Sequence, residues 1–190
     1  MYTLRPQQEE AIKDLASSFR AGNKRPILQA ATGFGKTLTA IDIISRAMRK
    51  GKRVLFVVDR LTLIDQTSRE FDKYGLDHGV IQGQHERTNS MMQLQLGSVQ
   101  TVTRRYRTFE NHFDLIIVDE CHAVYKSFVT MLTEGQWADV PVIGLSATPW
   151  TNSLGKIYDD LVLSKSTEWL IENGYLANYV AYAGVAPDLK

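Results

Sequence analysis

A glycine-rich segment in the first quarter of the chain has the residue types and the spacing of a phosphate-binding loop. The segment is Ala30-Ala31-Thr32-Gly33-Phe34-Gly35-Lys36-Thr37. Glycines allow such a loop to curl until successive backbone N–H groups point inward, and a helix that starts behind the loop adds positive potential at the same place. Lys36 could then reach the β- and γ-phosphates of a nucleotide, and the Thr37 hydroxyl could ligate Mg²⁺. Because the strict pattern has glycine where this chain has Ala30, a turn that only caps a helix is the alternative.

Two acidic side chains follow the clearest apolar run of the chain. Asp119-Glu120-Cys121-His122 comes directly after Leu115-Ile116-Ile117-Val118. In an open parallel sheet, ligands bind beyond the carboxyl ends of the strands, so we expect both carboxylates at the edge that holds the phosphate-binding loop. Asp119 could hold Mg²⁺, and Glu120 could orient or deprotonate the water that attacks the γ-phosphate. Taken alone, the same pair is typical of a helix N-cap with an acid in the first turn.

Hydroxyl and basic residues mark two further places where chemistry could occur. Ser146-Ala147-Thr148 follows another apolar run, so its hydroxyls could link the acidic pair to a moving part of the molecule. Hydrogen bonds within a local turn are the alternative. Arg104-Arg105-Tyr106-Arg107 is the densest basic cluster and could bind phosphates, with Tyr106 free to stack on a base. The alternative for this cluster is a solvated helix face.

The elements that must position these segments alternate between short apolar runs and longer amphipathic stretches, which indicates an α/β domain with a mainly parallel sheet. Strands are expected over residues 26–30, 53–58, 79–81, 115–118 and 140–145, with a strand end at 98–100 and a strand-like piece at 179–182. Helices are expected over residues 7–19, 36–49, 61–71 and 156–173. The phosphate-loop, acidic and hydroxyl segments each follow a strand, so one edge of the sheet should hold all three.

The composition is that of an ordinary globular domain without a global charge. The 190 residues are 44% hydrophobic and 23% charged, which excludes disorder of the whole chain and suits one good-sized domain. The net charge of +1 means that a nucleic acid would have to bind at a local patch. A single cysteine excludes a disulfide framework and a cysteine-based zinc cluster, and it favours a reducing, cytoplasmic compartment. Neither a transmembrane run nor a signal peptide is present, so no membrane partner is expected.

The three strand-end segments, in this order, resemble the first motor domain of superfamily 2 helicases. The segment Ala31-Thr32-Gly33-Phe34-Gly35-Lys36-Thr37 is similar to their motif I, Asp119-Glu120-Cys121-His122 to motif II in its DExH form, and Ser146-Ala147-Thr148 to motif III. The resemblance spans residues 4–185 and implies a RecA-like P-loop NTPase domain, in which helices flank both faces of the sheet. It also implies binding of ATP and Mg²⁺ at motifs I and II, and hydrolysis coupled to movement along nucleic acid, with DNA favoured over RNA.

Weaker similarities assign further residues to the nucleotide and the nucleic acid. Leu4-Arg5-Pro6-Gln7-Gln8 resembles the adenine-reading segment of the subgroup shared by excision-repair helicases and restriction-enzyme motors. That resemblance implies contacts from Arg5 and Gln8, since an aromatic residue often occupies the Gln7 position. Val58-Asp59-Arg60 resembles motif Ia and Val99-Gln100-Thr101 motif Ib. The implied nucleic-acid track consists of Arg60, Gln100, Thr101, Arg104 and Arg105.

The DExH histidine is expected to take part in coupling. In this family a histidine at the position of His122 contacts motif III or the second domain, so the resemblance implies that His122, Ser146 and Thr148 connect ATP hydrolysis to movement.

The resemblance further implies that the motor has two RecA-like domains. We expect residues 1–185 to be the first and residues 186–190 to begin the linker to a second domain that this chain lacks, together with its arginine finger. The chain is interpreted as the N-terminal half of a longer helicase or translocase that hydrolyses ATP poorly on its own. The alternatives are a double-stranded DNA translocase subunit of a restriction-modification system and a non-hydrolysing module that binds ATP or nucleic acid. The oligomeric state stays open.

Other residues that often carry chemistry have simpler explanations. Cys121 is expected to be a small buried residue rather than a reactive thiol. The expected packing residues are Trp137, Trp150 and Trp169. No spacing that indicates a metal site connects His78, His85 and His112.

Overall fold

A parallel β-sheet lies at the centre of the computed structural model, which describes residues 2–108, 113–123 and 125–178. Its strands are β1 (Pro26–Gln29), β2 (Val54–Val58), β3 (Gly79–Ile81), β4 (Leu94–Ser98), β5 (Leu115–Asp119), β6 (Val142–Ser146) and β7 (Asp160–Leu163). The order across the sheet is β3-β4-β2-β5-β6-β1-β7, and every neighbouring pair is parallel.

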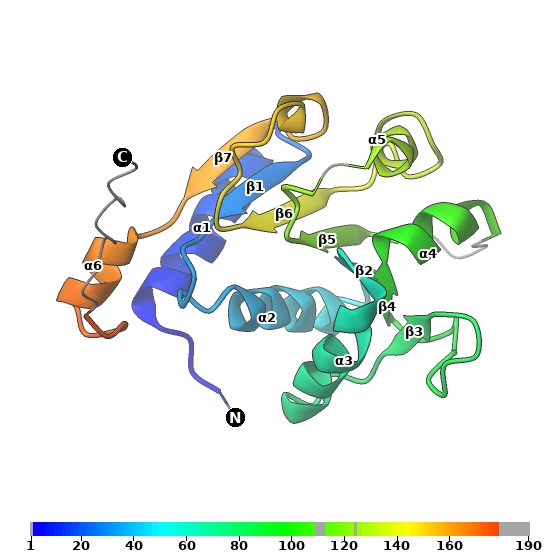
Figure 1. Cartoon of the computed structure of the whole chain (residues 1–190), viewed down its shortest axis with the longest axis horizontal. Helices are drawn as coiled ribbons and strands as arrows, with labels where there is room; N and C mark the ends of the chain where they lie inside the picture. The colour runs from blue at the N-terminus through cyan, green and yellow to red at the C-terminus, as the bar shows by residue number, and fades with distance from the viewer. Residues whose placement is uncertain (1, 109–112, 124, 179–190) are drawn as a thin grey trace, which may run out of the picture.

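Helices cover both faces of this sheet (Figure 1). They are α1 (Pro6–Arg20), α2 (Lys36–Arg49), α3 (Ile64–Lys73), α4 (Val99–Arg105), α5 (Lys126–Thr133) and α6 (Thr167–Glu172), with short 3₁₀ turns at Leu61–Leu63, Tyr106–Thr108 and Leu154–Lys156. Helices α1, α2 and α3 pack on one face, and α4 and α5 pack on the other. The predicted fold class, an α/β domain with a parallel sheet between two helical layers, is confirmed.

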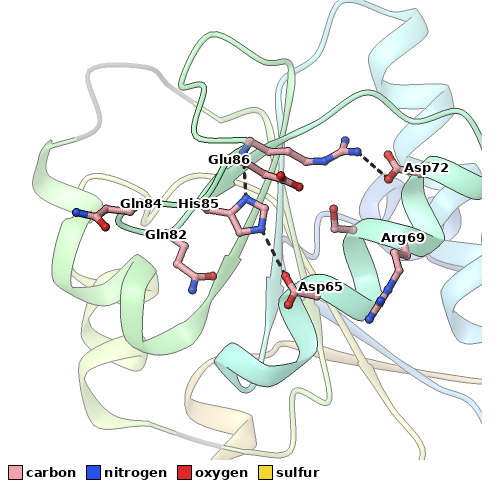
Figure 2. A pocket seen from close by; sticks show the side chains of 9 residues that line it. Asp65, Arg69, Asp72, Gln82, Gln84, His85 and Glu86 are labelled. Carbon is pink, nitrogen blue, oxygen red and sulfur yellow. Dashed lines mark hydrogen bonds and ion pairs between the residues drawn. The ribbon is translucent and has the colours of Figure 1, made fainter.

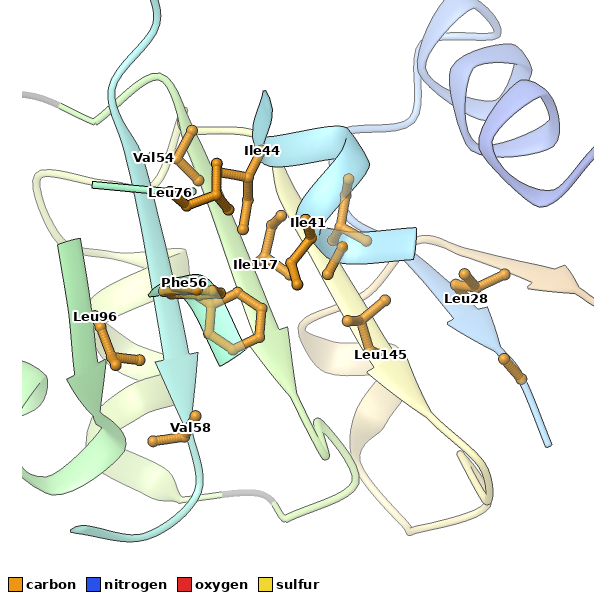
Figure 3. Close-up of a cluster of buried hydrophobic side chains, with 14 of the residues drawn as sticks. Leu28, Ile41, Ile44, Val54, Phe56, Val58, Leu76, Leu96, Ile117 and Leu145 are labelled. Atoms are coloured by element: carbon orange, nitrogen blue, oxygen red, sulfur yellow. The ribbon is translucent and has the colours of Figure 1, made fainter. Parts of the chain in front are cut away.

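Two hydrophobic layers explain why the central strands are apolar at every position. In β2, Phe56 belongs to the layer under α2 and α3, whereas its neighbours Leu55 and Val57 belong to the layer under α4 and α5. Figure 3 shows the first layer, where Ile41 and Ile44 of α2 lie over the sheet. A strand with both faces covered has no solvent side, so its sequence is a continuous apolar run rather than an alternating one.

The elements with strong patterns lie where they were expected. Helix α2 has the predicted bounds, α1 extends the predicted helix by one residue at each end, and the strands at 26–30, 53–58, 79–81, 115–118 and 140–145 are present with ends shifted by at most two residues. The helix expected over 61–71 is a 3₁₀ turn that continues into α3.

Two expectations were wrong, and some short elements were missed. The strand end placed at 98–100 stops at Ser98, whose hydroxyl accepts from the Thr101 N–H and caps α4. The helix expected over 156–173 is instead a 3₁₀ end, the strand β7 and the short helix α6. Strand β7 is at the sheet edge and buries only Val162 well, so it lacks the apolar run that identifies a central strand. Helix α5 was not anticipated.

The cysteine and two of the tryptophans lie where they were expected. Cys121 is buried, and burial raises the pKa of its thiol to about 12. Trp137 is buried, and Trp169 stacks on Tyr175 with ring centroids 5.8 Å apart. Trp150 contradicts the expectation that it packs, because 68% of it is exposed.

Some expectations lie outside the described residues. They are the strand-like piece at 179–182, the linker at 186–190 and His112. Among the described residues, the helices are too short or too polar for any of them to span a bilayer.

Candidate functional site

The carboxyl ends of β1, β5 and β6 place the phosphate-loop, acidic and hydroxyl segments at one edge of the sheet. Strand β6 lies between β5 and β1, and the register aligns Asp119 with Leu145 and Gln29 with Ser146. The loop starts beside the hydroxyl segment, since the Ala30 N–H donates to the Ser146 carbonyl at 2.9 Å. The structure therefore brings together the three segments that the sequence singled out.

The two glycines of the loop are required by both backbone conformation and space. Gly33 has φ +83° and Gly35 has φ +95°, a region that favours glycine. A Cβ atom on Gly33 would lie 2.3 Å from the Leu176 side chain, and one on Gly35 would lie 2.3 Å from Gln8 Nε2. The loop therefore keeps its curled backbone at the start of α2 only with glycine at these positions.

Core packing anchors the loop through Ala30 and Phe34. Both residues are fully buried in the layer under α2, so the methyl group of Ala30 has a place where the strict pattern has glycine. Phe34 is one of the residues expected to bind nucleotide, and its ring is buried in the core. Only the backbone of Phe34 faces the candidate site, where its carbonyl accepts from Gln8.

Lys36 and Thr37 begin α2 directly behind the loop. The Lys36 ammonium folds back and donates to the Ala30 carbonyl at 3.2 Å, and the Thr37 side chain is exposed. Both groups are therefore at the N-terminal end of a 14-residue helix, where the helix dipole favours an anion.

Gln8 joins the N-terminal helix to the phosphate loop. Its buried amide donates to the Phe34 and Gly35 carbonyls at 3.1 and 3.3 Å and accepts from the Arg5 N–H at 2.8 Å. The Arg5 guanidinium lies over the Tyr175 ring at 5.3 Å from its centroid. Both residues thus lie beside the loop, as an adenine contact requires, and in this structure Gln8 supports the loop itself.

Asp119 ends β5 in a setting that opposes its negative charge. Burial raises the pKa of the Asp119 carboxyl above its usual value, and the neighbouring Glu120 charge adds to the rise. The hydrogen bond from the Glu120 N–H and the positive charge of Lys36 lower this pKa but do not reverse the shift. A carboxylate in such a place gains most from a bound cation.

A strained backbone and a short side-chain network fix the residues that follow Asp119. Glu120 has φ +49°, which is uncommon for a residue with a side chain. Its carboxylate lies 3.2 Å from His122 Nδ1, which lies 3.1 Å from the Ser146 hydroxyl. The same hydroxyl accepts from the Thr148 N–H at 3.1 Å. One contiguous network therefore contains Glu120 and all three residues expected to couple the site to movement.

The proposed nucleic-acid residues follow β2 and β4, next to β5 in the sheet. Gln100 donates to the Asp59 carbonyl at 3.0 Å, and Thr101 is part of the cap of α4. Arg60 is exposed after β2, while Arg104 and Arg105 are exposed in the last turn of α4. Arg60 and Gln100 therefore lie just beyond the ends of β2 and β4, and Arg104 and Arg105 lie at the far end of α4.

Tyr106 contradicts the expectation that it is free to stack on a base. Its ring packs against Trp137, with centroids 6.0 Å apart, and its hydroxyl accepts from Arg107 at 3.0 Å. The Arg107 side chain is thereby held on Tyr106, whereas Arg104 and Arg105 are exposed on α4.

A polar pocket of about 650 Å³ lies at the β3 end of the sheet, away from the phosphate loop (Figure 2). It lies between α3 and the loop after β3. Two pairs of its polar groups lie close together: His85 lies 3.4 Å from Asp65, and Arg87 lies 2.8 Å from Asp72. This pocket contains no residue of the three strand-end segments.

The sequence did not reveal two contacts at the site. Tyr125, five residues after Glu120, donates its hydroxyl to Asp59 at 2.7 Å. Tyr175 and Leu176 lie against Arg5 and Gly33. Neither contact has a local sequence signal, because each joins residues more than 60 positions apart.

The sequence is similar to restriction-enzyme subunits and to a putative helicase. Residues 1–151 match the family described as "Type III restriction enzyme, res subunit". The chain is 32% identical to the type I restriction enzyme EcoAI endonuclease subunit of Escherichia coli over 96% of the chain and 24% of that protein. It is 29% identical to the putative ATP-dependent helicase IRC3 of Saccharomyces cerevisiae over 91% of the chain and 28% of that protein. The chain thus spans about a quarter of the length of these relatives.

The fold is shared with a solved restriction-modification enzyme. The structure of a nuclease-deletion mutant of the Type ISP enzyme LlaGI, in complex with a DNA substrate mimic, matches with a TM-score of 0.73 and 17% identity. The match covers 90% of this chain and 20% of that one.

Proposed function

Because the chain belongs to the family of type III restriction enzyme res subunits, we propose that it is the ATP-binding motor domain of a superfamily 2 helicase or translocase. The observation that carries this proposal is the single sheet edge where the glycine loop, Lys36, Asp119 and the Glu120–His122–Ser146 network lie together. A structural turn with a helix cap would explain each segment alone but not their assembly at one edge.

The residues at this edge suit Mg²⁺–ATP. The loop is curled at two glycines that leave no space for a Cβ atom, so its backbone can approach phosphates closely. The Thr37 hydroxyl and the Asp119 carboxylate are the hard oxygen donors that Mg²⁺ prefers. When bound, Mg²⁺–ATP supplies the γ-phosphoryl group and the metal that neutralises its developing charge.

Each residue at the site has a proposed task. Lys36 exchanges the Ala30 carbonyl for the β- and γ-phosphate oxygens, which offer its ammonium full negative charges. Glu120 orients the attacking water and accepts its proton, and the His122 contact holds the Glu120 carboxylate in place. Arg5 and Gln8, beside the loop, contact the adenine.

The nucleic acid is proposed to lie along the ends of β2 and β4. Arg60, Arg104 and Arg105 would bind backbone phosphates, with Gln100 and Thr101 between them. DNA is favoured over RNA because the family and the EcoAI relative are restriction enzymes. The likeness to EcoAI also favours translocation along duplex DNA without strand separation as a second candidate function.

A second RecA-like domain is proposed as the partner of residues 1–185. Phosphoryl transfer needs positive charge at the γ-phosphoryl oxygens, and an arginine finger supplies roughly 10³–10⁵ of the rate in related chemistry. By the family resemblance that finger comes from the second domain, so we propose that this chain binds ATP but turns it over slowly by itself.

Calorimetric titration with Mg²⁺–ATP tests the proposed nucleotide site. Lys36→Ala should weaken binding by roughly tenfold or more, because charge-assisted hydrogen bonds to phosphate contribute about 1.5–3 kcal/mol. Lys13→Ala, which removes an exposed lysine from the middle of α1, is the matched control and should leave the affinity unchanged. Equal affinities of the wild type and Lys36→Ala would refute the assignment.

A further inference from the structure

One hydrogen bond connects the segment after Glu120, the proposed general base, to the proposed nucleic-acid track. The Tyr125 hydroxyl donates to Asp59 Oδ1 at 2.7 Å across 66 positions of sequence. Tyr125 caps the start of α5, five residues after Glu120, and Asp59 is the first residue after β2. The bond therefore bridges the ends of β5 and β2, which are neighbours in the sheet.

Asp59 has three hydrogen-bond partners: its sequence neighbour Arg60 and the distant residues Gln100 and Tyr125. Oδ1 accepts from Tyr125, Oδ2 accepts from Arg60 Nε at 3.2 Å, and the backbone carbonyl accepts from Gln100 at 3.0 Å. The Asp59 side chain is 14% exposed, whereas that of Arg60 is 75% exposed. Arg60 can therefore leave Asp59 for a phosphate while Asp59 stays in place.

The bond to Asp59 constrains a stretch of chain that is already strained. Glu120 holds its φ of +49° at one end of this stretch, and Tyr125 is fixed at the other. Asp59 also raises the pKa of the Tyr125 hydroxyl, as expected where a phenol donates to a carboxylate. A hydrogen bond to an ionised acceptor is about twice as strong as a hydrogen bond between neutral groups. The strength of the Tyr125–Asp59 bond therefore depends on whether a cation also pairs with the Asp59 carboxylate.

We propose that Tyr125 is a positioning residue that couples phosphate binding at Arg60 to the placement of Glu120 through its hydrogen bond to Asp59. When a phosphate takes Arg60, the Asp59 carboxylate loses its paired cation and holds the Tyr125 hydroxyl more tightly. Tyr125 is then held in place five residues after Glu120, which favours the nucleotide-bound arrangement. This inference rests on the proposed function, because it assumes that both ligands bind at this edge.

The experiment is a pair of titrations that measure how nucleotide changes DNA affinity. Fluorescence anisotropy of a fluorescein-labelled DNA duplex gives the Kd with and without saturating Mg²⁺ and a non-hydrolysable ATP analogue. In the wild type the analogue should tighten DNA binding by about fivefold or more, within the usual range of coupling. The coupling ratio is the Kd for DNA without the analogue divided by the Kd with it. In Tyr125→Phe this ratio should fall to within about twofold of unity, while the affinity for each ligand alone changes by less than about twofold.

Two further variants separate coupling from general damage. Tyr106→Phe removes a hydroxyl that bonds to Arg107 on the same side of the sheet and should keep the wild-type ratio. Asp59→Asn keeps the shape but removes the charge, so it should also reduce the ratio, and the double variant Asp59→Asn/Tyr125→Phe should lose no more than Tyr125→Phe alone.

The outcomes distinguish this inference from the function on which it rests. A wild type that binds neither ligand would refute the proposed function and the inference together. If the wild type binds both ligands but the analogue leaves its Kd for DNA unchanged, the inference alone would be overturned. The inference would also be overturned if both ligands bind with coupling and Tyr125→Phe, together with Asp59→Asn, keeps the full ratio.

Discussion

At the scale of single residues, Asp119 carries a charge that the folded protein opposes until a cation binds. The pKa of its carboxyl is raised by burial and by Glu120, so the folded state holds the proton more tightly than the unfolded state. The Asp119 carboxyl therefore contributes to the free energy of unfolding below the usual pKa of aspartate. This contribution is lost as the pH rises through the raised pKa.

Asp119→Asn is expected to stabilise the ligand-free protein near neutral pH and to abolish the contribution of Mg²⁺ to nucleotide binding. The amide cannot ionise, so the gain in the free energy of unfolding should shrink as the pH falls through the raised pKa and should vanish below the usual pKa of aspartate. Urea denaturation at neutral and acidic pH measures this difference. A variant that is less stable than the wild type at neutral pH would show that the charge is already compensated.

Gly35 offers a second residue-scale prediction, with Gly51 as its matched control. Both residues have positive φ, but a Cβ atom on Gly51 meets nothing within 4 Å, whereas one on Gly35 would lie 2.3 Å from Gln8 Nε2. Gly51→Ala should cost about 1 kcal/mol of stability, and Gly35→Ala clearly more, because the steric conflict adds to the conformational cost. Gln8→Ala in the Gly35→Ala background should recover part of the loss. Equal losses for the two glycine variants in urea denaturation would contradict the close approach of Gln8.

The residues that could be predicted are those whose chemistry depends on a short local pattern. Lys36, Thr37, Asp119 and Glu120 follow strands within a few positions, so the fold places them almost automatically. The exposure of Trp150 depends on distant packing partners and was predicted wrongly.

At the scale of elements, α4 presents two arginines that define a local patch on a chain of net charge +1. Arg104→Ala/Arg105→Ala should reduce the slope of log affinity against log salt for duplex DNA by about 1.8, since each phosphate contact contributes about 0.9. Arg107→Ala should have little effect, because Tyr106 holds that side chain. DNA titrations across a salt series measure the slopes. An unchanged slope in the double variant would mean that the α4 arginines are a solvated face.

The predictability of an element followed how clear its apolar pattern is. Strand β2 is buried at all five positions and was identified from sequence, whereas β7 is covered mainly through Val162 and was taken for part of a helix. Helix α4 has seven residues, too few to show a clear helical period next to the end of β4. Strand β4 is also buried at all five positions, but its sequence, Leu-Gln-Leu-Gly-Ser, is not a continuous apolar run. The missed elements are therefore short and lack a clear apolar pattern.

At the scale of the whole molecule, one continuous sheet edge carries the candidate nucleotide site and the candidate nucleic-acid track. Strands β1, β6 and β5 end at the first, and β2 and β4 end at the second. The Asp59–Tyr125 bond joins the two regions. The proposed second domain would add to this edge a cation that stabilises the transferred phosphoryl group.

Steady-state ATP hydrolysis, with and without a second RecA-like domain and DNA, tests the central claim most directly. The chain alone should hydrolyse ATP slowly, the addition of the second domain should raise turnover by roughly 10³-fold or more, and DNA should raise it further. Glu120→Gln in the two-domain protein should bind ATP normally and lose turnover, because the amide keeps the shape of the side chain but not its basicity. Turnover by the chain alone that equals that of the two-domain protein, or full activity of Glu120→Gln, would contradict the account.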